Sequence, residues 1–144
     1  MFSKTNLIST LVIAVWAYLG GYLLWDVIGG FLFEGHGGSA TGVWKETPDY
    51  LHVVIASVFL AFAFSTIYSK LSGSAGISHG ATYGLWVGIL IGLGERWYDL
   101  AFSNFTDLTG AFINLGLNLV FYVIAGVLVG LVYEKLSKNV SNTH

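Results

Sequence analysis

Hydrophobic residues along this chain fall into four long runs that are separated by short polar segments. The runs cover approximately residues 7–31, 50–68, 79–97 and 108–133. About 20 mostly apolar residues cross the hydrocarbon core of a bilayer as an α-helix, so each run is long enough to span a membrane. The pattern therefore predicts an all-α integral membrane protein, a bundle of four transmembrane helices that forms one domain over residues 1–144.

Composition supports a membrane-embedded chain and narrows its chemistry. Of the 144 residues, 55% are hydrophobic and only 10% are charged, and the mean hydropathy is +0.72. There is no cysteine, which excludes disulfides and thiolate chemistry. A net charge of −2 without a basic tract argues against nucleic acid as a partner. The lipid bilayer is the expected surrounding, and any chemistry must lie between the helices or at their ends.

Basic residues predict the orientation of the four spans. An even number of spans places both termini on one side, together with Lys4, Lys70, Lys135 and Lys138. The opposite side contains two basic residues, Lys45 and Arg96, among the acidic residues Glu34, Glu46, Asp49, Glu95, Asp99 and Asp107. Since cytoplasmic loops carry an excess of Lys and Arg, we expect both termini in the cytoplasm and the chain in the plasma (inner) membrane.

A helix start signal precedes the second run. Thr47 can cap a helix, Pro48 suits the first helical position, and Asp49 favours the positive end of the helix dipole. Pro48 is the only proline of the chain, so no span should be kinked by proline. The second helix is therefore expected to begin at this signal.

Similar residues close alternate runs. Trp25 and Asp26 end the first run much as Trp97 and Asp99 end the third, and a Tyr-x-Lys-Leu pattern ends the second and fourth. Two repeated helical hairpins would produce this similarity, as in transporters built from parallel repeats. The general enrichment of aromatic and basic residues at membrane interfaces would also produce it. Both interpretations stay open.

Small residues recur at every fourth position of the third run. They are Gly76, Gly80, Gly84, Gly88 and Gly92, and the fourth run has a matching row of Gly110, Asn114, Asn118, Tyr122, Gly126 and Gly130. Such rows allow close backbone approach in lipid, so we expect them to pack helices within the bundle or between copies. The complement could be Ser57, Ala61 and Ser65 of the second run, or Gly126 and Gly130. Because the row slants around its helix, one straight partner should not follow all of it.

Polar residues in or near the runs are candidate contacts for an ion or a small polar solute. They are Asp26, Arg96, Asp99, Asn114, Asn118 and Tyr122. An amide that faced lipid would lack hydrogen-bond partners, so the two asparagines must face protein or water. They form either interhelical hydrogen bonds or, with Tyr122, a polar ladder along the fourth run. Beyond Tyr122 the row turns to glycine, which argues against a continuous pore.

Asp26 and Arg96 are the ionisable residues nearest the apolar core, where such groups are functional candidates. Arg96 is the only arginine. We expect it to pair with Asp26 and clamp the first run to the third, or to pair with Asp99 if Asp26 lies at the water boundary. In the first case, replacing Arg96 with Ala should lower thermal stability.

The predicted outer side also offers nitrogen and oxygen ligands of the kind that bind metal ions. They are Glu34, His36, Asp49, His52, Glu95 and Asp99, but their spacing matches no metal-binding motif. The chain also lacks a phosphate-binding loop, a nucleophile elbow and a zinc-protease motif. We therefore predict no cofactor, no metal site and no catalytic residue.

These observations favour a non-enzymatic function. The preferred hypothesis is an accessory subunit or assembly component of a membrane complex or homo-oligomer, because packing signals dominate the runs. The alternative is a small oligomeric transporter or channel for an ion or small polar solute. A weaker alternative is a metal protein or membrane enzyme with its site on the outer side.

Overall fold

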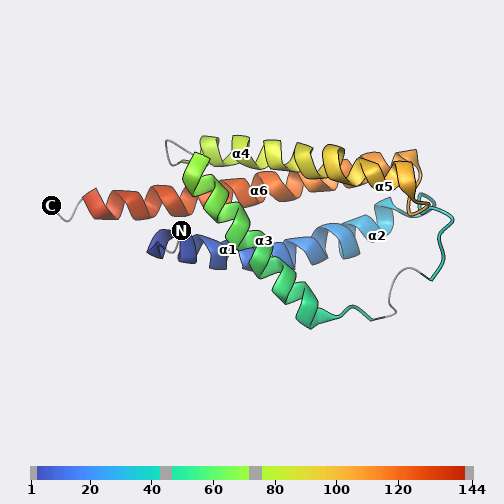
Figure 1. Cartoon of the computed structure of the whole chain (residues 1–144), viewed down its shortest axis with the longest axis horizontal. Helices are drawn as coiled ribbons and strands as arrows, with labels where there is room; N and C mark the ends of the chain where they lie inside the picture. Colours follow the sequence, from blue (N-terminus) through green and yellow to red (C-terminus); the bar gives the residue numbers. More distant parts are fainter. Residues whose placement is uncertain (1–2, 43–46, 72–75, 142–144) are drawn as a thin grey trace.

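The computed structural model describes residues 3–42, 47–71 and 76–141, with the backbone alone for residues 137–141. Within these ranges it is all-helical, with four helices long and apolar enough to cross a membrane (Figure 1). They cover Lys4–Leu32, Tyr50–Leu71, Ile77–Phe102 and Leu108–Leu136. The prediction of four helices long and apolar enough to span a membrane is confirmed, and each helix extends beyond the predicted range at one or both ends. Lys45, Glu46 and the side chain of Lys138, used to predict orientation, lie outside this description.

The first and third spans are each interrupted by a π-helical segment. The first consists of α1 (Lys4–Gly21), η1 (Tyr22–Ile28) and α2 (Gly29–Leu32). The third consists of α4 (Ile77–Ile89), η2 (Leu90–Glu95) and α5 (Arg96–Phe102). A π turn is wider than an α turn and occurs often at functional sites. Neither span contains proline, so the irregularity of both comes from these π turns.

The second span, α3 (Tyr50–Leu71), begins later than the sequence signal suggested. The Asp49 side chain accepts a hydrogen bond from the His52 N–H at 3.3 Å, and the Asp49 carbonyl accepts one from Val53. Asp49 therefore caps α3. The expectation that Thr47 caps and Pro48 is the first helical residue is wrong. Asp49 directly precedes the first residue of α3, so its carboxylate can accept hydrogen bonds from the free N–H groups of the first turn.

α4 and α6 (Leu108–Ser141) form the most extensive helix pair and run antiparallel. A methyl group added to Gly80 would overlap the carbonyl oxygen of Gly126, and one added to Gly126 would overlap that of Gly80. Gly84 faces the Tyr122 carbonyl in the same way, and Gly92 also lies against α6. The expectation that no single helix follows the whole row is wrong, because α6 carries its own row at the same spacing.

α3 packs against α1, and the small residues proposed as a complement to the glycine row are buried on α3 away from that row. Ser57, Ala61 and Ser65 are all buried, and the Ser65 hydroxyl donates a hydrogen bond to Asn6 of α1. Two partners were considered for the glycine row of α4, the small residues of α3 and those of α6, and in the structure α6 lies against the row. The contribution of these small residues to helix association stays a prediction.

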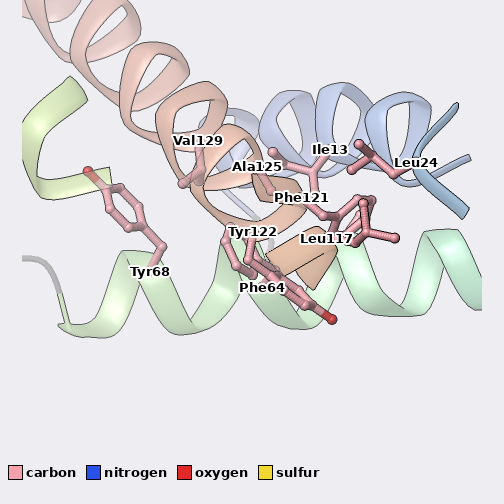
Figure 2. Close-up of a cluster of buried hydrophobic side chains, with 10 residues drawn as sticks. Ile13, Leu24, Phe64, Tyr68, Leu117, Phe121, Tyr122, Ala125 and Val129 are labelled. Carbon is pink, nitrogen blue, oxygen red and sulfur yellow. The ribbon is translucent and has the colours of Figure 1, made fainter. Parts of the chain in front are cut away.

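The half of the bundle near the termini has a closed core (Figure 2). Ile13, Ala61, Ala125 and Val129 are fully buried where α1, α3 and α6 meet. At the same end, Asn6 is 1% exposed and connects the three helices. Its Nδ2 donates to Thr66 Oγ1 at 3.0 Å, and its Oδ1 accepts from the hydroxyls of Ser65 and Tyr133. We call this region, from Asn6 to Ala125 and Val129, the closed end.

The other half is less tightly packed and is called the open end. Figure 1 shows the first part of α3 diverging from the other helices, and residues 50–56 are all exposed. The loops beyond α2 and α5 are instead joined by backbone hydrogen bonds. Gly38 donates to the Phe105 carbonyl at 3.0 Å, and Ala40 donates to the Asn104 carbonyl at 3.1 Å. The first and third spans are therefore linked at their ends while the space between them stays open.

Candidate functional site

A cavity of about 810 Å³ lies inside the open end. Its walls come from the first span on one side, from η2 and α5 on the other, and from α6 behind; α3 borders it through Leu60. Toward the termini the cavity stops at Phe121 and Tyr122, and beyond them Ala61 and Ala125 are fully buried. A volume of this size is within the range of about 300–1,000 Å³ seen for small-molecule sites.

All the polar residues singled out from the sequence border this one cavity. Asp26 comes from η1, Arg96 and Asp99 come from α5, and Asn114, Asn118 and Tyr122 come from α6. The residues of α6 share a face because they are spaced four apart along the helix. The tertiary structure therefore brings three spans together at one candidate site, and contact of these residues with a ligand stays a prediction.

Asn118 presents an unused hydrogen-bond acceptor at this site. The residue is 4% exposed, and its Nδ2 donates to the backbone oxygen of Asn114 at 2.8 Å and to the Asn114 Oδ1 at 3.2 Å. Both of those partners are acceptors, so the orientation of the Asn118 amide is determined. Within the described ranges no group donates to Asn118 Oδ1, nor does the Tyr122 hydroxyl form a hydrogen bond.

Asn114 connects the first span to α6. The Trp25 indole N–H donates to Asn114 Oδ1 at 2.9 Å, and the Trp25 ring lies edge-on to Phe121 with ring centroids 5.5 Å apart. The interhelical hydrogen bond expected of the asparagines is therefore formed at Asn114. Sequence reasoning missed Trp25 as a site residue. The available signal was its indole N–H, which usually finds a partner when it is partly buried.

Arg96 pairs with carboxylates of its own span. Its Nε lies 3.3 Å from Glu95 Oε2, and its Nη1 lies 3.3 Å from Asp99 Oδ2. Among the described residues it forms no ion pair with Asp26, so the expected clamp between the first and third spans is absent. Glu95 precedes Arg96 directly and Asp99 lies one turn further along the same helix, so both reach Arg96 without any approach of the two spans. Asp26 itself is exposed and has no ion-pair partner in the described part of the chain.

The rim of the cavity includes Thr106, which sequence reasoning did not single out, and His36, which it considered only as a possible metal ligand. His36 Nδ1 lies 3.0 Å from Asp107 Oδ2, and the Thr106 hydroxyl donates to the His36 carbonyl at 3.1 Å. Asp107 also caps α6 by accepting from the Gly110 N–H at 2.7 Å. This backbone hydrogen bond, followed by that of His36, holds the pKa of Asp107 below its usual value.

The histidines that were noted as possible metal ligands on the predicted outer side each pair with one aspartate. His36 pairs with Asp107, and His52 Nδ1 lies 2.8 Å from Asp49 Oδ2. Over residues 3–42, 47–71 and 76–141, no three His, Asp or Glu side chains are grouped closely enough to hold a metal ion. No observation on these residues therefore favours the weaker alternative of a metal site or enzyme.

The site combines carboxylates, an amide oxygen, a hydroxyl group and aromatic rings inside a membrane-spanning bundle. Such a wall can bind a small polar molecule through hydrogen bonds and ring contacts. Comparison with models of protein families, with curated proteins and with solved structures finds no match to this chain.

Proposed function

We propose that the protein is a small membrane carrier that binds a small polar solute in the cavity of the open end. The observation that carries this proposal is the meeting of polar side chains from three spans in one cavity of about 810 Å³. Polar and ionisable side chains are rare within membrane spans because burying them is costly, and they commonly mark substrate paths. A chain with packing functions alone would have no need to collect them at one point.

The shape of the cavity suggests one state of a carrier. It is accessible at the open end and blocked toward the termini by the packed residues of the closed end, such as Ala61 and Ala125. Carriers expose a site near the middle of the membrane to one side at a time. The two π-helical segments, η1 and η2, contribute lining residues and are places where each span can bend. With the termini in the cytoplasm, the solute would enter from outside.

Transport into liposomes tests this proposal. Purified protein is reconstituted, and uptake is measured for a panel of labelled amines, amino acids and sugars. We expect uptake of at least one solute, and a decrease of more than tenfold in Asn118→Leu, which replaces the cavity amide by an apolar side chain of similar size. Thr10→Val is the control, because the Thr10 hydroxyl bonds the Asn6 carbonyl of its own helix and Thr10 does not border the cavity. No uptake across the panel, or unchanged uptake in Asn118→Leu, would contradict the proposal.

A second candidate function is an accessory subunit of a larger membrane complex or homo-oligomer. It is supported by the exposed first part of α3, where Val53, Val54 and Ile55 are 39%, 47% and 41% exposed. In a membrane this surface contacts either lipid or another protein. Native mass spectrometry of protein extracted gently from its own membranes separates the two functions. A defined complex with other proteins supports the subunit, whereas a monomer or homo-oligomer that retains a solute supports the carrier.

A further inference from the structure

We infer that the cavity selects small organic cations, meaning an ammonium group attached to a short apolar body. This inference rests on the proposed function and specifies its substrate class. It depends on the balance of charge in the wall, on the free hydrogen-bonding atoms and on the aromatic lining.

The basic groups of the wall already have carboxylate partners. Arg96 lies 3.3 Å from both Glu95 and Asp99, and His36 lies 3.0 Å from Asp107. Asp26 borders the same cavity and has no ion-pair partner among the described residues. The ionisable side chain of the wall that has no ion-pair partner among the described residues is therefore a carboxyl group, and a carboxylate attracts a cation and repels an anion.

The surroundings reinforce this preference. Around the open end the described carboxylates are Asp26, Glu34, Asp49, Glu95, Asp99 and Asp107, against the single cation Arg96. Carboxylates therefore outnumber cations among the described side chains of this end, and an excess of one sign of charge raises the local concentration of the opposite charge. These carboxylates would repel a ligand that carries a carboxylate before it reached the wall of the cavity.

The uncharged groups of the wall also suit an ammonium donor. Asn118 Oδ1 is a free acceptor on a residue that is 4% exposed, and the Tyr122 hydroxyl can accept as well. Asn114 Nδ2 is left as a donor, but a neutral amide binds an anion more weakly than a carboxylate binds a cation. The rings of Trp25, Phe33 and Phe121 line the cavity, and aromatic faces attract organic cations.

Calorimetric titration with matched probes tests the inference. Protein in dodecyl maltoside is titrated with n-butylammonium, butyrate and butyramide, which share size and shape and differ in charge. We expect n-butylammonium to bind at least ten times more tightly than the other two. Equal or tighter binding of butyrate or butyramide would overturn the inference.

Variants of Asp26 connect this preference to the cavity. Asp26→Asn should weaken n-butylammonium binding at least tenfold, and Asp26→Glu, which keeps the charge, should restore most of it. Glu134→Gln is the control, because Glu134 lies in the last turns of α6, at the other end of the bundle, and does not border the cavity. A melting curve verifies that each variant is folded. Unchanged affinity in Asp26→Asn would also overturn the inference.

Failure of the cation preference can be told apart from failure of the carrier proposal. If butyrate or butyramide binds best and Asn118→Leu abolishes that binding, the cavity is a solute site and the preference for cations is wrong. If none of the probes binds, the inference is wrong, and the uptake panel decides on the carrier.

The ammonium group could belong to a free amine or to the ethanolamine head of a lipid. Adding phosphatidylethanolamine to the micelles distinguishes the two sources. A lower apparent affinity of the wild type for n-butylammonium with phosphatidylethanolamine, but not with phosphatidylcholine, supports a lipid headgroup as the cation. Unchanged affinity supports a soluble amine.

Discussion

The two ends of this bundle are built from the same four spans and differ in how they fill the space between them. At the closed end, Ile13, Ala125 and Val129 are fully buried, and the polar groups of Asn6 bond across three helices. At the open end, polar side chains face a cavity, and Asp26 has no ion-pair partner in the described part of the chain. The closed end buries its polar groups and bonds Asn6 across three helices, although the hydroxyls of Ser9 and Tyr68 are buried there without a hydrogen-bond partner among the described residues. The open end leaves polar side chains along a cavity.

The difference does not arise from the glycine rows, which bring α4 and α6 together along both ends. At the closed end Gly80 faces Gly126, and at the open end Gly92 lies against Leu115 and Asn118. What changes is the other side of α6. α1 and the second part of α3 pack against it near the termini (Figure 2). Farther along, η1 contacts it through Leu24 and Trp25, while the first part of α3 diverges (Figure 1). Close packing of one helix pair is therefore compatible with a cavity beside it.

The largest expected effect comes from breaking the closest contact of the closed end. Gly80→Ala would place a methyl group on the Gly126 carbonyl oxygen, so α4 and α6 must separate. We expect a loss of about 2–3 kcal/mol in the free energy of unfolding, as for overpacked cores. Denaturation in mixed detergent micelles measures it.

Two further glycines serve as comparisons for that variant. Gly92→Ala meets the mobile end of the Leu115 side chain at 2.9 Å, so its loss should be smaller. Gly116→Ala meets nothing within 4 Å and should leave stability unchanged or slightly raised. If Gly80→Ala and Gly116→Ala unfold alike, the close approach of α4 and α6 does not stabilise the closed end.

A second variant removes the polar connection between the helices of the closed end. Asn6→Ala leaves the hydroxyls of Ser65 and Tyr133 without their Asn6 partner in a buried place. Hydrogen bonds between helices in membranes contribute about 0.6–2 kcal/mol, so we expect a loss of about 1–2 kcal/mol. The control is Ser69→Ala, whose exposed hydroxyl bonds the Thr66 carbonyl of its own helix. Equal stability of the two variants would show that the Asn6 bonds are not needed.

A smaller effect is expected at the rim of the open end. The folded protein lowers the pKa of Asp107 from the usual 3.8, so the ionised cap stabilises the fold above that pH. The contribution is lost as pH falls through the lowered value. Asp107→Ala should therefore melt at a lower temperature than the wild type at pH 7. The two melting temperatures should converge under more acidic conditions, and parallel curves would argue against the cap.

The smallest effect is expected for Arg96→Ala. The Arg96 side chain is 49% exposed, and its ion pairs are with residues of its own span. Such surface pairs contribute about 0–1 kcal/mol, so the free energy of unfolding should change by less than about 0.5 kcal/mol. A large loss of stability would restore the clamp to the first span that the sequence alone had suggested.

Much of the architecture could be predicted from the sequence, because it depends on properties that the chain carries locally. The lengths and hydropathy of the runs require four helices in lipid, and buried amides must avoid lipid wherever the helices lie. For the same reason the residues chosen as polar candidates, such as Asn118 and Asp26, all border the cavity. Each of these residues was recognised because placing its polar side chain in hydrocarbon costs free energy.

Partner identities could not be predicted, because they depend on which residues the fold brings together. Arg96 had plausible partners in Asp26 and Asp99, and only the positions of the spans decided for Asp99 together with Glu95. The glycine row of α4 had two possible complements, and the antiparallel register of α6 decided between them. The indole N–H of Trp25 indicated that it would need a partner, but not that this partner would be Asn114 across the bundle.

The sequence by itself thus determined that the chain has four segments long and apolar enough to cross a membrane, and which side chains would be costly to place in lipid. Only the tertiary structure decided that those side chains meet in one cavity and that the other end is closed. The free energy of transferring a residue from water to hydrocarbon depends on that residue and its near neighbours, so it can be estimated from the sequence alone. A cavity depends on the bend of η1, the divergence of α3 and the pairing of α4 with α6, which no short stretch of sequence encodes.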